Sequence, residues 1–131
     1  MRILGIDYGE KRIGIAITDP EGVFALPHGV LENTRESISK IVLLCKEKEV
    51  AEIVLGKSVD FKGEPNPVQK KIEKFKEDLL KSITLPVFYE NETLTTKEAR
   101  HIQGKHKNID SSAAALILDS YLMRKQHNTR A

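Results

Sequence analysis

The sequence lacks the cysteines and the long apolar runs that mark several classes of protein. Its single cysteine, Cys45, cannot form an internal disulfide and has no CxxC partner, which fits a reducing cytosol and argues against a structural zinc site. We expect Cys45 to fill space in the core. No apolar stretch approaches the roughly 18 residues of a membrane span, and the first residues follow a strand pattern instead of that of a signal peptide. A soluble, cytoplasmic protein with no membrane partner is therefore expected.

An excess of one charge is also lacking. The chain has 21 Lys and Arg residues against 19 Asp and Glu residues, and a net charge of +2 does not by itself indicate a nucleic-acid-binding protein. With 131 residues, 40% of them hydrophobic, the chain can build a core but not two lobes around a cleft. No internal repeat, low-complexity tract or interdomain linker is visible. We expect one domain over residues 1–131, with about five frayed residues at the C-terminus.

Apolar periodicity predicts an α/β fold. Three strands joined by tight turns are expected at residues 2–8, 12–18 and 23–32, and they form an antiparallel meander. The rest of the chain predicts alternating helices and strands: a helix over 34–49, a strand at 53–56, a helix from 66 or 67, and a strand at 86–89. Parallel connections of this kind imply a mixed five-stranded sheet with helices on both faces.

Two more helices are expected after the last strand. Thr95 and Glu98 have the spacing of a capping box, which predicts a third helix. Asp110 or Ser111 is expected to cap a fourth helix, which carries apolar residues at helical spacing.

Acidic residues follow the strands where a catalytic site would lie. Asp7 comes directly after a buried strand and Glu92 follows another, at the carboxyl ends where open α/β sheets bind their ligands. Asp110 could bring a third carboxylate to the same edge. Three such acids are stable together only with cations, and hard oxygen ligands select Mg²⁺ or Mn²⁺ over zinc. Two ions about 3.5 to 4 Å apart would activate water for phosphodiester cleavage.

Each acid also has a plainer interpretation. Asp7 could form an Asx-turn with the amide of Gly9, and Glu92 could be a solvated surface acid. Asp110 could serve only as a helix cap, although capping and metal binding are compatible. The residues alone leave these alternatives open.

Basic residues could follow a phosphate backbone beside this edge. Arg100 and Lys105 belong to a basic cluster shortly after Glu92, and Lys57 follows the fourth strand. Lys11 and Arg12 are adjacent, so within a strand at most one of them faces the acidic edge.

Three motifs together resemble the YqgF/RuvX family over nearly the whole chain. They are Asp7-Tyr8-Gly9 with the following Lys11-Arg12-Ile13-Gly14, Leu94-Thr95-Thr96 with Glu98-Ala99, and Ile109-Asp110 before an alanine-rich helix. The resemblance implies an RNase H-like fold and a metal-dependent nuclease. This family is described as a proposed Holliday-junction resolvase and as acting at the 5′ end of precursor 16S ribosomal RNA. Its acidic triad would be Asp7, Glu92 and Asp110.

Two departures from the family pattern affect substrate contacts. The usual Asp-Glu-Arg is Asn91-Glu92-Thr93 here, so an acid and an arginine beside the glutamate are missing. The usual Gly-Leu-Pro after the fourth strand is Gly56-Lys57-Ser58, which adds a cation beside the substrate path.

The favoured hypothesis is an endonuclease that uses Mg²⁺ or Mn²⁺ to process the 5′ end of pre-16S rRNA in ribosome biogenesis. Its partners would then be pre-rRNA and the ribosome. One alternative is a Holliday junction resolvase acting on branched DNA, which would need a dimer; the sequence leaves monomer or dimer open. Another is a non-catalytic nucleic-acid-binding or ribosome-binding module. The run from Gly5 to Gly9 also resembles the phosphate-binding hairpin of actin-like ATPases and sugar kinases, but those proteins use a duplicated fold and this chain supplies one half.

Overall fold

The computed structural model describes residues 1–57, 67–91 and 107–130, the last with side chains for 111–126 only. Its centre is a five-stranded sheet in the order β3-β2-β1-β4-β5. The strands β1 (Arg2–Asp7), β2 (Arg12–Thr18) and β3 (Ala25–Glu32) are antiparallel, whereas β4 (Val50–Lys57) and β5 (Val87–Asn91) continue the sheet in parallel with β1. The expected meander and mixed sheet are confirmed.

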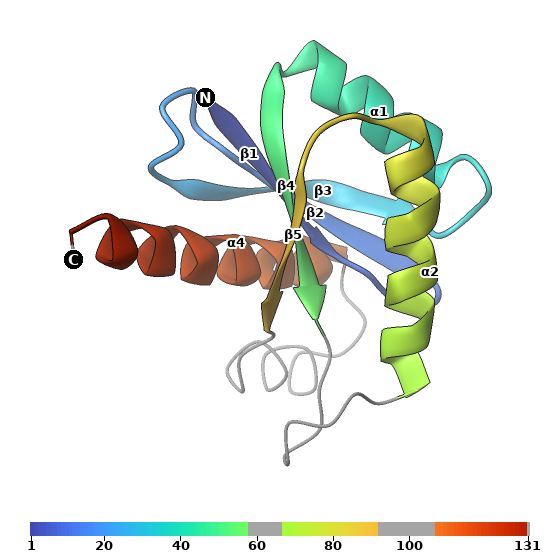
Figure 1. Cartoon of the computed structure of the whole chain (residues 1–131). Coiled ribbons are helices and arrows are strands. Elements are labelled where there is room, and N and C mark those ends of the chain that lie inside the picture. Colours follow the sequence, from blue (N-terminus) through green and yellow to red (C-terminus); the bar gives the residue numbers. More distant parts are fainter. Residues whose placement is uncertain (58–66, 92–106, 131) are drawn as a thin grey trace.

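Helices cover both faces of the sheet, as expected (Figure 1). The helices α1 (Ser37–Glu47) and α2 (Pro67–Ser82) lie on one face, and α4 (Lys107–Arg130) crosses the other. The third helix predicted from Thr95 and Glu98 lies outside the described residues. None of the helices that the structure describes is both long and apolar enough to cross a membrane.

The core has two layers because successive strand residues point to opposite faces. Leu4 and Ile6 of β1 join the cluster under α1 and α2, whereas Ile3 joins the cluster under α4. Cys45 lies in the first cluster, as predicted, and burial raises the pKa of its thiol to about 11. The thiol therefore stays protonated and fills space.

The start of the last helix differs from the sequence-based expectation. α4 begins at Lys107, so neither Asp110 nor Ser111 is its N-cap, and that prediction was wrong. Ser111 is buried within the helix. Asp and Ser favour caps through local hydrogen bonds, but packing of the following apolar residues against the sheet overrides that local preference.

The third strand also begins later than predicted, at Ala25 instead of Val23. The carboxylate of Asp19 accepts hydrogen bonds from the backbone amides of Val23 and Phe24, each at 2.8 Å. Those amides are therefore held in the turn before β3 and do not join the strand.

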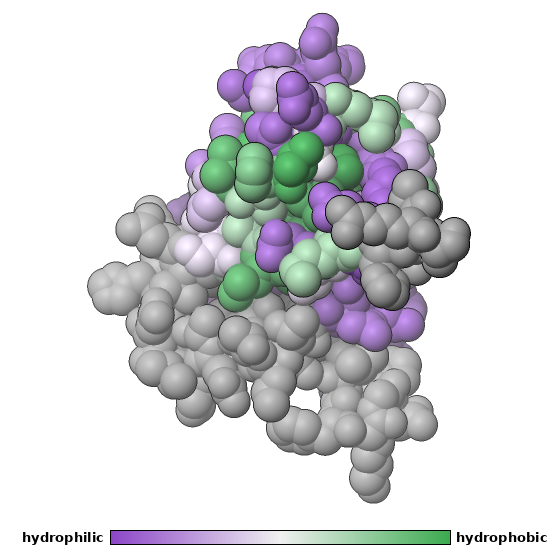
Figure 2. All heavy atoms as spheres, turned by 90° about the vertical axis from the view of Figure 1, so that its left-hand side faces the viewer, coloured by the Kyte–Doolittle hydropathy of each residue, from purple (hydrophilic) through white to green (hydrophobic). Residues whose placement is uncertain are grey.

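The side of the molecule away from α1 and α2 carries an apolar area bordered by polar groups (Figure 2). Exposed apolar side chains of the chain include Phe24 and Leu26 near the β3 edge and Met123 of α4.

Candidate active site

The carboxyl ends of three parallel strands form one edge of the sheet. Asp7 ends β1, and the register pairs Ile6 with Leu55 of β4 and Lys57 of β4 with Asn91 of β5. Neighbouring strands are about 4.8 Å apart, so the ends of β1 and β5 are separated by roughly 10 Å. The chain leaves β5 at Asn91, one residue before Glu92 in the sequence.

Asp7 is a buried carboxylate at this edge, with 4% of its surface exposed. It lies on the same face of β1 as Ile3 and Gly5, which is the face covered by α4. Burying a carboxylate is costly unless hydrogen bonds or a cation compensate for the lost water. The buried carboxylate of Asp7 therefore needs polar partners or a cation at this edge.

Gly9 shapes the connection that follows Asp7. A Cβ atom at Gly9 would lie 2.5 Å from the backbone carbonyl oxygen of Arg12. Only glycine permits so close a turn, which folds the chain directly from β1 into β2.

The path of α4 over β1 places position 110 near the same edge. Ile3 and Leu122 line one cavity, while Gly5 contacts Leu118 and Ala114, so moving along β1 toward Asp7 means moving along α4 toward its N-terminus. Asp110 precedes Ala114 by four residues, or about 6 Å along the helix axis. For residue 110 the structure describes the backbone alone.

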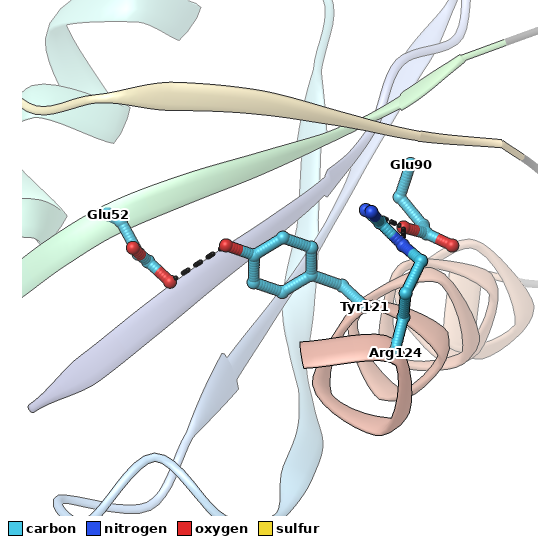
Figure 3. A network of polar contacts seen from close by, with 4 residues as sticks. All are labelled: Glu52, Glu90, Tyr121 and Arg124. Carbon is cyan, nitrogen blue, oxygen red and sulfur yellow. Dashed lines mark hydrogen bonds and ion pairs between the residues drawn. The ribbon is translucent and has the colours of Figure 1, made fainter. Parts of the chain in front are cut away.

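A polar network holds α4 against β4 and β5 (Figure 3). The hydroxyl of Tyr121 donates to the buried carboxylate of Glu52 at 3.1 Å, and Lys125 Nζ pairs with the same oxygen at 2.9 Å. Arg124 pairs with Glu90 at 2.6 Å. Burial, followed by the charge of Glu52, raises the pKa of Tyr121 to about 12, so the hydroxyl keeps its proton. Polar contacts thus add to apolar packing in fixing the helix.

The expected basic residues are only partly described. Lys11 is exposed between β1 and β2, and Arg12 is half-buried at the start of β2. Lys57 ends β4, with its ammonium 6.0 Å from the centre of the Tyr89 ring. Arg100 and Lys105 lie outside the described residues. All three described cations are near the edge where β1 and β4 end: Lys11 in the turn before β2, Arg12 on β2 and Lys57 on β4.

Of the three predicted metal ligands, Asp7 is the one whose side chain the structure describes. Glu92 and the side chain of Asp110 lie outside what the structure describes. Within the described part of the chain, no group of three or more His, Cys, Asp or Glu side chains could hold a metal ion. The carboxylate of Asp7 is a hard oxygen donor, which suits Mg²⁺ or Mn²⁺.

Sequence reasoning missed the residues that position α4. Glu52 and Tyr121 are far apart in the sequence, and nothing local marks them as partners. Gly5 has a detectable signal, because a glycine inside an apolar strand often marks a close approach of another backbone.

Comparison with solved structures defines the class of fold. The chain resembles Thermus thermophilus RuvC in complex with a Holliday junction substrate, with a TM-score of 0.63 and 15% identity over 96% of both chains. It also resembles the fowlpox virus Holliday junction resolvase, with a TM-score of 0.54 and 17% identity, covering 95% of this chain and 99% of the other. The protein therefore has an RNase H-like fold of the RuvC type.

The chain belongs to the RuvX family, whose model is described as "Holliday junction resolvase" and matches residues 1–124. A relative from Maridesulfovibrio salexigens is 34% identical over 95% of this chain and 99% of its own length. One from Dictyoglomus turgidum is 37% identical over 93% of this chain and 94% of its own length. Both relatives are named as proposed pre-16S rRNA nucleases.

Proposed function

We propose that the protein is a metal-dependent endonuclease that cleaves phosphodiester bonds in structured nucleic acid in the cytoplasm. Asp7, Glu92 and Asp110 would hold Mg²⁺ or Mn²⁺. The observation that carries the proposal is the burial of Asp7 on the α4 side of the sheet, at the end of a parallel strand. Membership of the RuvX family supports the same chemistry.

The described residues next to the other two acids in the sequence support this ligand set. On β5, Phe88 and Glu90 contact Tyr121 and Arg124 of α4, and Glu92 is the next residue in that alternation along the sequence. The backbone at Asp110 belongs to the turn of α4 that precedes the contact with Gly5.

In this proposal the acidic residues would bind the metal ions and the basic residues would bind the substrate. The bound ions would activate the attacking water and stabilise the leaving oxygen. The carboxylates would hold the ions, with Asp7 doing so from a buried strand end. Lys11, Arg12 and Lys57, together with Arg100 and Lys105, would bind phosphates on either side of the cleaved bond.

The favoured substrate is the 5′ extension of pre-16S rRNA, because the relatives carry that name. A four-way DNA junction is the second candidate, because the family description and the RuvC complex name it. The ribosome would be a partner only in the first case.

A direct comparison of the two substrates tests this proposal. An end-labelled rRNA fragment with its 5′ extension and a labelled four-way junction are incubated with the protein in Mg²⁺, Mn²⁺ or EDTA. We expect the RNA to be cleaved only when metal is present. We expect the junction to be cleaved more slowly or not at all. Cleavage of the junction alone would reverse the substrate assignment. Binding of both substrates without cleavage in Mn²⁺ would instead support a non-catalytic binding module.

A further inference from the structure

A groove of about 490 Å³ lies on the molecule between the start of α1 and the outer side of α2. Its floor is formed by Tyr8, Ile38 and Phe75, and its walls by the lysines of α2 and by Asn33, Thr34, Arg35 and Ser37. Tyr8 directly follows Asp7 in the sequence but packs on the α1 and α2 face, whereas Asp7 is on the α4 face, so the groove reaches the edge of the candidate active site from the opposite face of the sheet.

The groove is basic. Four cations line it, Arg35, Lys70, Lys71 and Lys74, against the single carboxylate of Asp78. Lys71 Nζ pairs with Glu10 at 2.8 Å and Lys74 Nζ pairs with Asp78 at 2.9 Å.

The remaining two cations carry uncompensated charge. Among the residues that the structure describes, Arg35 and Lys70 have no ion-pair partner. The paired lysines are more than half exposed, and exposed ion pairs are weak enough to exchange a carboxylate for a phosphate. The groove therefore attracts polyanions.

An aromatic ring, that of Tyr8, forms part of the groove floor. Tyr8 is half-buried, and its ring packs against that of Phe75 with 5.1 Å between their centres. Phe75 is itself held in the core, so the Tyr8 ring has a fixed support. Aromatic rings beside cations bind unpaired nucleotides, because bases stack on the ring while phosphates contact the cations.

We propose that this groove binds a single-stranded segment of the nucleic acid that continues from the cleaved bond around the edge of the sheet, with phosphates on Arg35 and Lys70 and a base against Tyr8. The proposal rests on the proposed nuclease function and specifies its substrate as one with unpaired nucleotides beside the cleavage site. A concave pocket of this volume admits unstacked nucleotides, whereas a duplex presents its phosphates on a wide, regular surface.

Binding in EDTA tests the groove separately from cleavage. Fluorescence anisotropy is measured with an eight-nucleotide single-stranded RNA and with a blunt RNA duplex of the same length. The variant Arg35→Gln/Lys70→Gln removes the two uncompensated cations. The matched control is Lys40→Gln/Lys46→Gln, which removes two exposed cations of α1 that do not line the groove.

We expect the groove variant to weaken single-strand binding about tenfold and to reduce the slope of log Kd against log salt by roughly 1.4, the value for two phosphate contacts on a single strand. The control should change binding less than about twofold, since distant exposed charges are screened. Tyr8→Leu should weaken binding without changing the slope, because it removes stacking and no charge. Arg35→Lys/Lys70→Arg keeps both charges and should retain the wild-type slope.

The outcomes separate the two proposals. If the wild-type protein binds the single strand but cleaves neither substrate, the proposed nuclease function is overturned and the proposal for the groove stands. If the groove variant and the control bind the single strand equally well, the proposal for the groove is overturned. It is also overturned if the groove variant loses duplex binding and single-strand binding to the same extent. If cleavage occurs, the groove variant should raise KM and leave kcat within about twofold, because ground-state binding is removed.

Discussion

Gly5 of β1 packs directly against Ala114 of α4, so that a methyl group on Gly5 would lie 3.1 Å from the Ala114 carbonyl oxygen. The same methyl group would lie 2.9 Å from Cβ of Leu118. Real Cβ atoms essentially never come within 3.0 Å of another heavy atom and seldom within 3.4 Å, and a helix backbone cannot move aside cheaply. The missing side chain of Gly5 therefore sets the distance between α4 and the strand that ends in Asp7.

Gly5→Ala should push α4 away from β1. We expect a loss of about 1 to 3 kcal/mol in the free energy of unfolding, as for other overpacked sites, measured by urea denaturation. Nuclease activity should fall as well, because Asp110 moves with α4. The control is Gly29→Ala in β3, where nothing lies within 4 Å of the added methyl group. If both variants unfold at the same urea concentration, the close packing of α4 is refuted.

Glu52→Gln should loosen the contact between α4 and β4. Glu52 is buried and accepts from Tyr121 and pairs with Lys125, so loss of its charge should cost about 1 to 2 kcal/mol of unfolding free energy. Tyr121→Phe removes only the hydroxyl and should cost less, near 1 kcal/mol. Chemical denaturation of both variants is compared with that of Glu47→Gln, an exposed glutamate at the end of α1, which should match the wild type. A larger loss in Glu47→Gln than in Glu52→Gln would contradict the network.

Asp19→Ala should destabilise the turn between β2 and β3 in a pH-dependent way. Hydrogen bonds from the Phe24 and Val23 amides hold the pKa of Asp19 below its ordinary value of 3.8. A lowered pKa in the folded state means that this stabilisation is complete above the unfolded pKa and disappears as the pH falls through the folded pKa.

Thermal melts of the wild type and of Asp19→Ala should therefore differ most near neutral pH and converge in acid. Glu21→Ala, at an exposed neighbour in the same turn, controls for substitution there. A difference in Tm that grows toward acid pH would show that the sign of the linkage is wrong.

Much of the fold could be predicted from the sequence, because the spacing of the apolar residues in each segment matches the side chains that the structure buries. The wholly apolar run Ile53 to Leu55 predicts a strand covered on both faces, and β4 is such a strand. The stripe of Ile72, Phe75 and Leu79 predicts the buried face of α2. Local pattern is sufficient wherever the same residues determine both the element and its packing.

The sequence is less informative where contacts between residues far apart in the chain determine the structure. The start of α4 was mispredicted because the Asp110 and Ser111 cap signals are local, while the helix is stabilised by its packing on the sheet. The Glu52 to Tyr121 contact joins residues 69 positions apart and leaves no local trace. For the site, the position of Asp7 at the end of a buried strand could be predicted from its neighbours and is confirmed, whereas the roles of Asp7, Glu92 and Asp110 as metal ligands stay predictions.

The central claim is that Asp7 is a metal ligand of a nuclease, and Asp7→Asn tests it most directly. The measurement is the cleavage rate of the labelled 5′-extended rRNA in Mn²⁺, with the Mn²⁺-induced rise in Tm followed in parallel. Asp119→Asn, an exposed aspartate of α4, is the matched control.

Even groups that only support a metal ligand typically contribute 10- to 100-fold, so we expect Asp7→Asn to lose roughly a hundredfold or more in rate. It should also lose the rise in Tm with Mn²⁺, because the ion no longer binds the folded state preferentially, while Asp119→Asn keeps both. Cleavage by Asp7→Asn at the wild-type rate, with an unchanged response of Tm to Mn²⁺, would contradict the account.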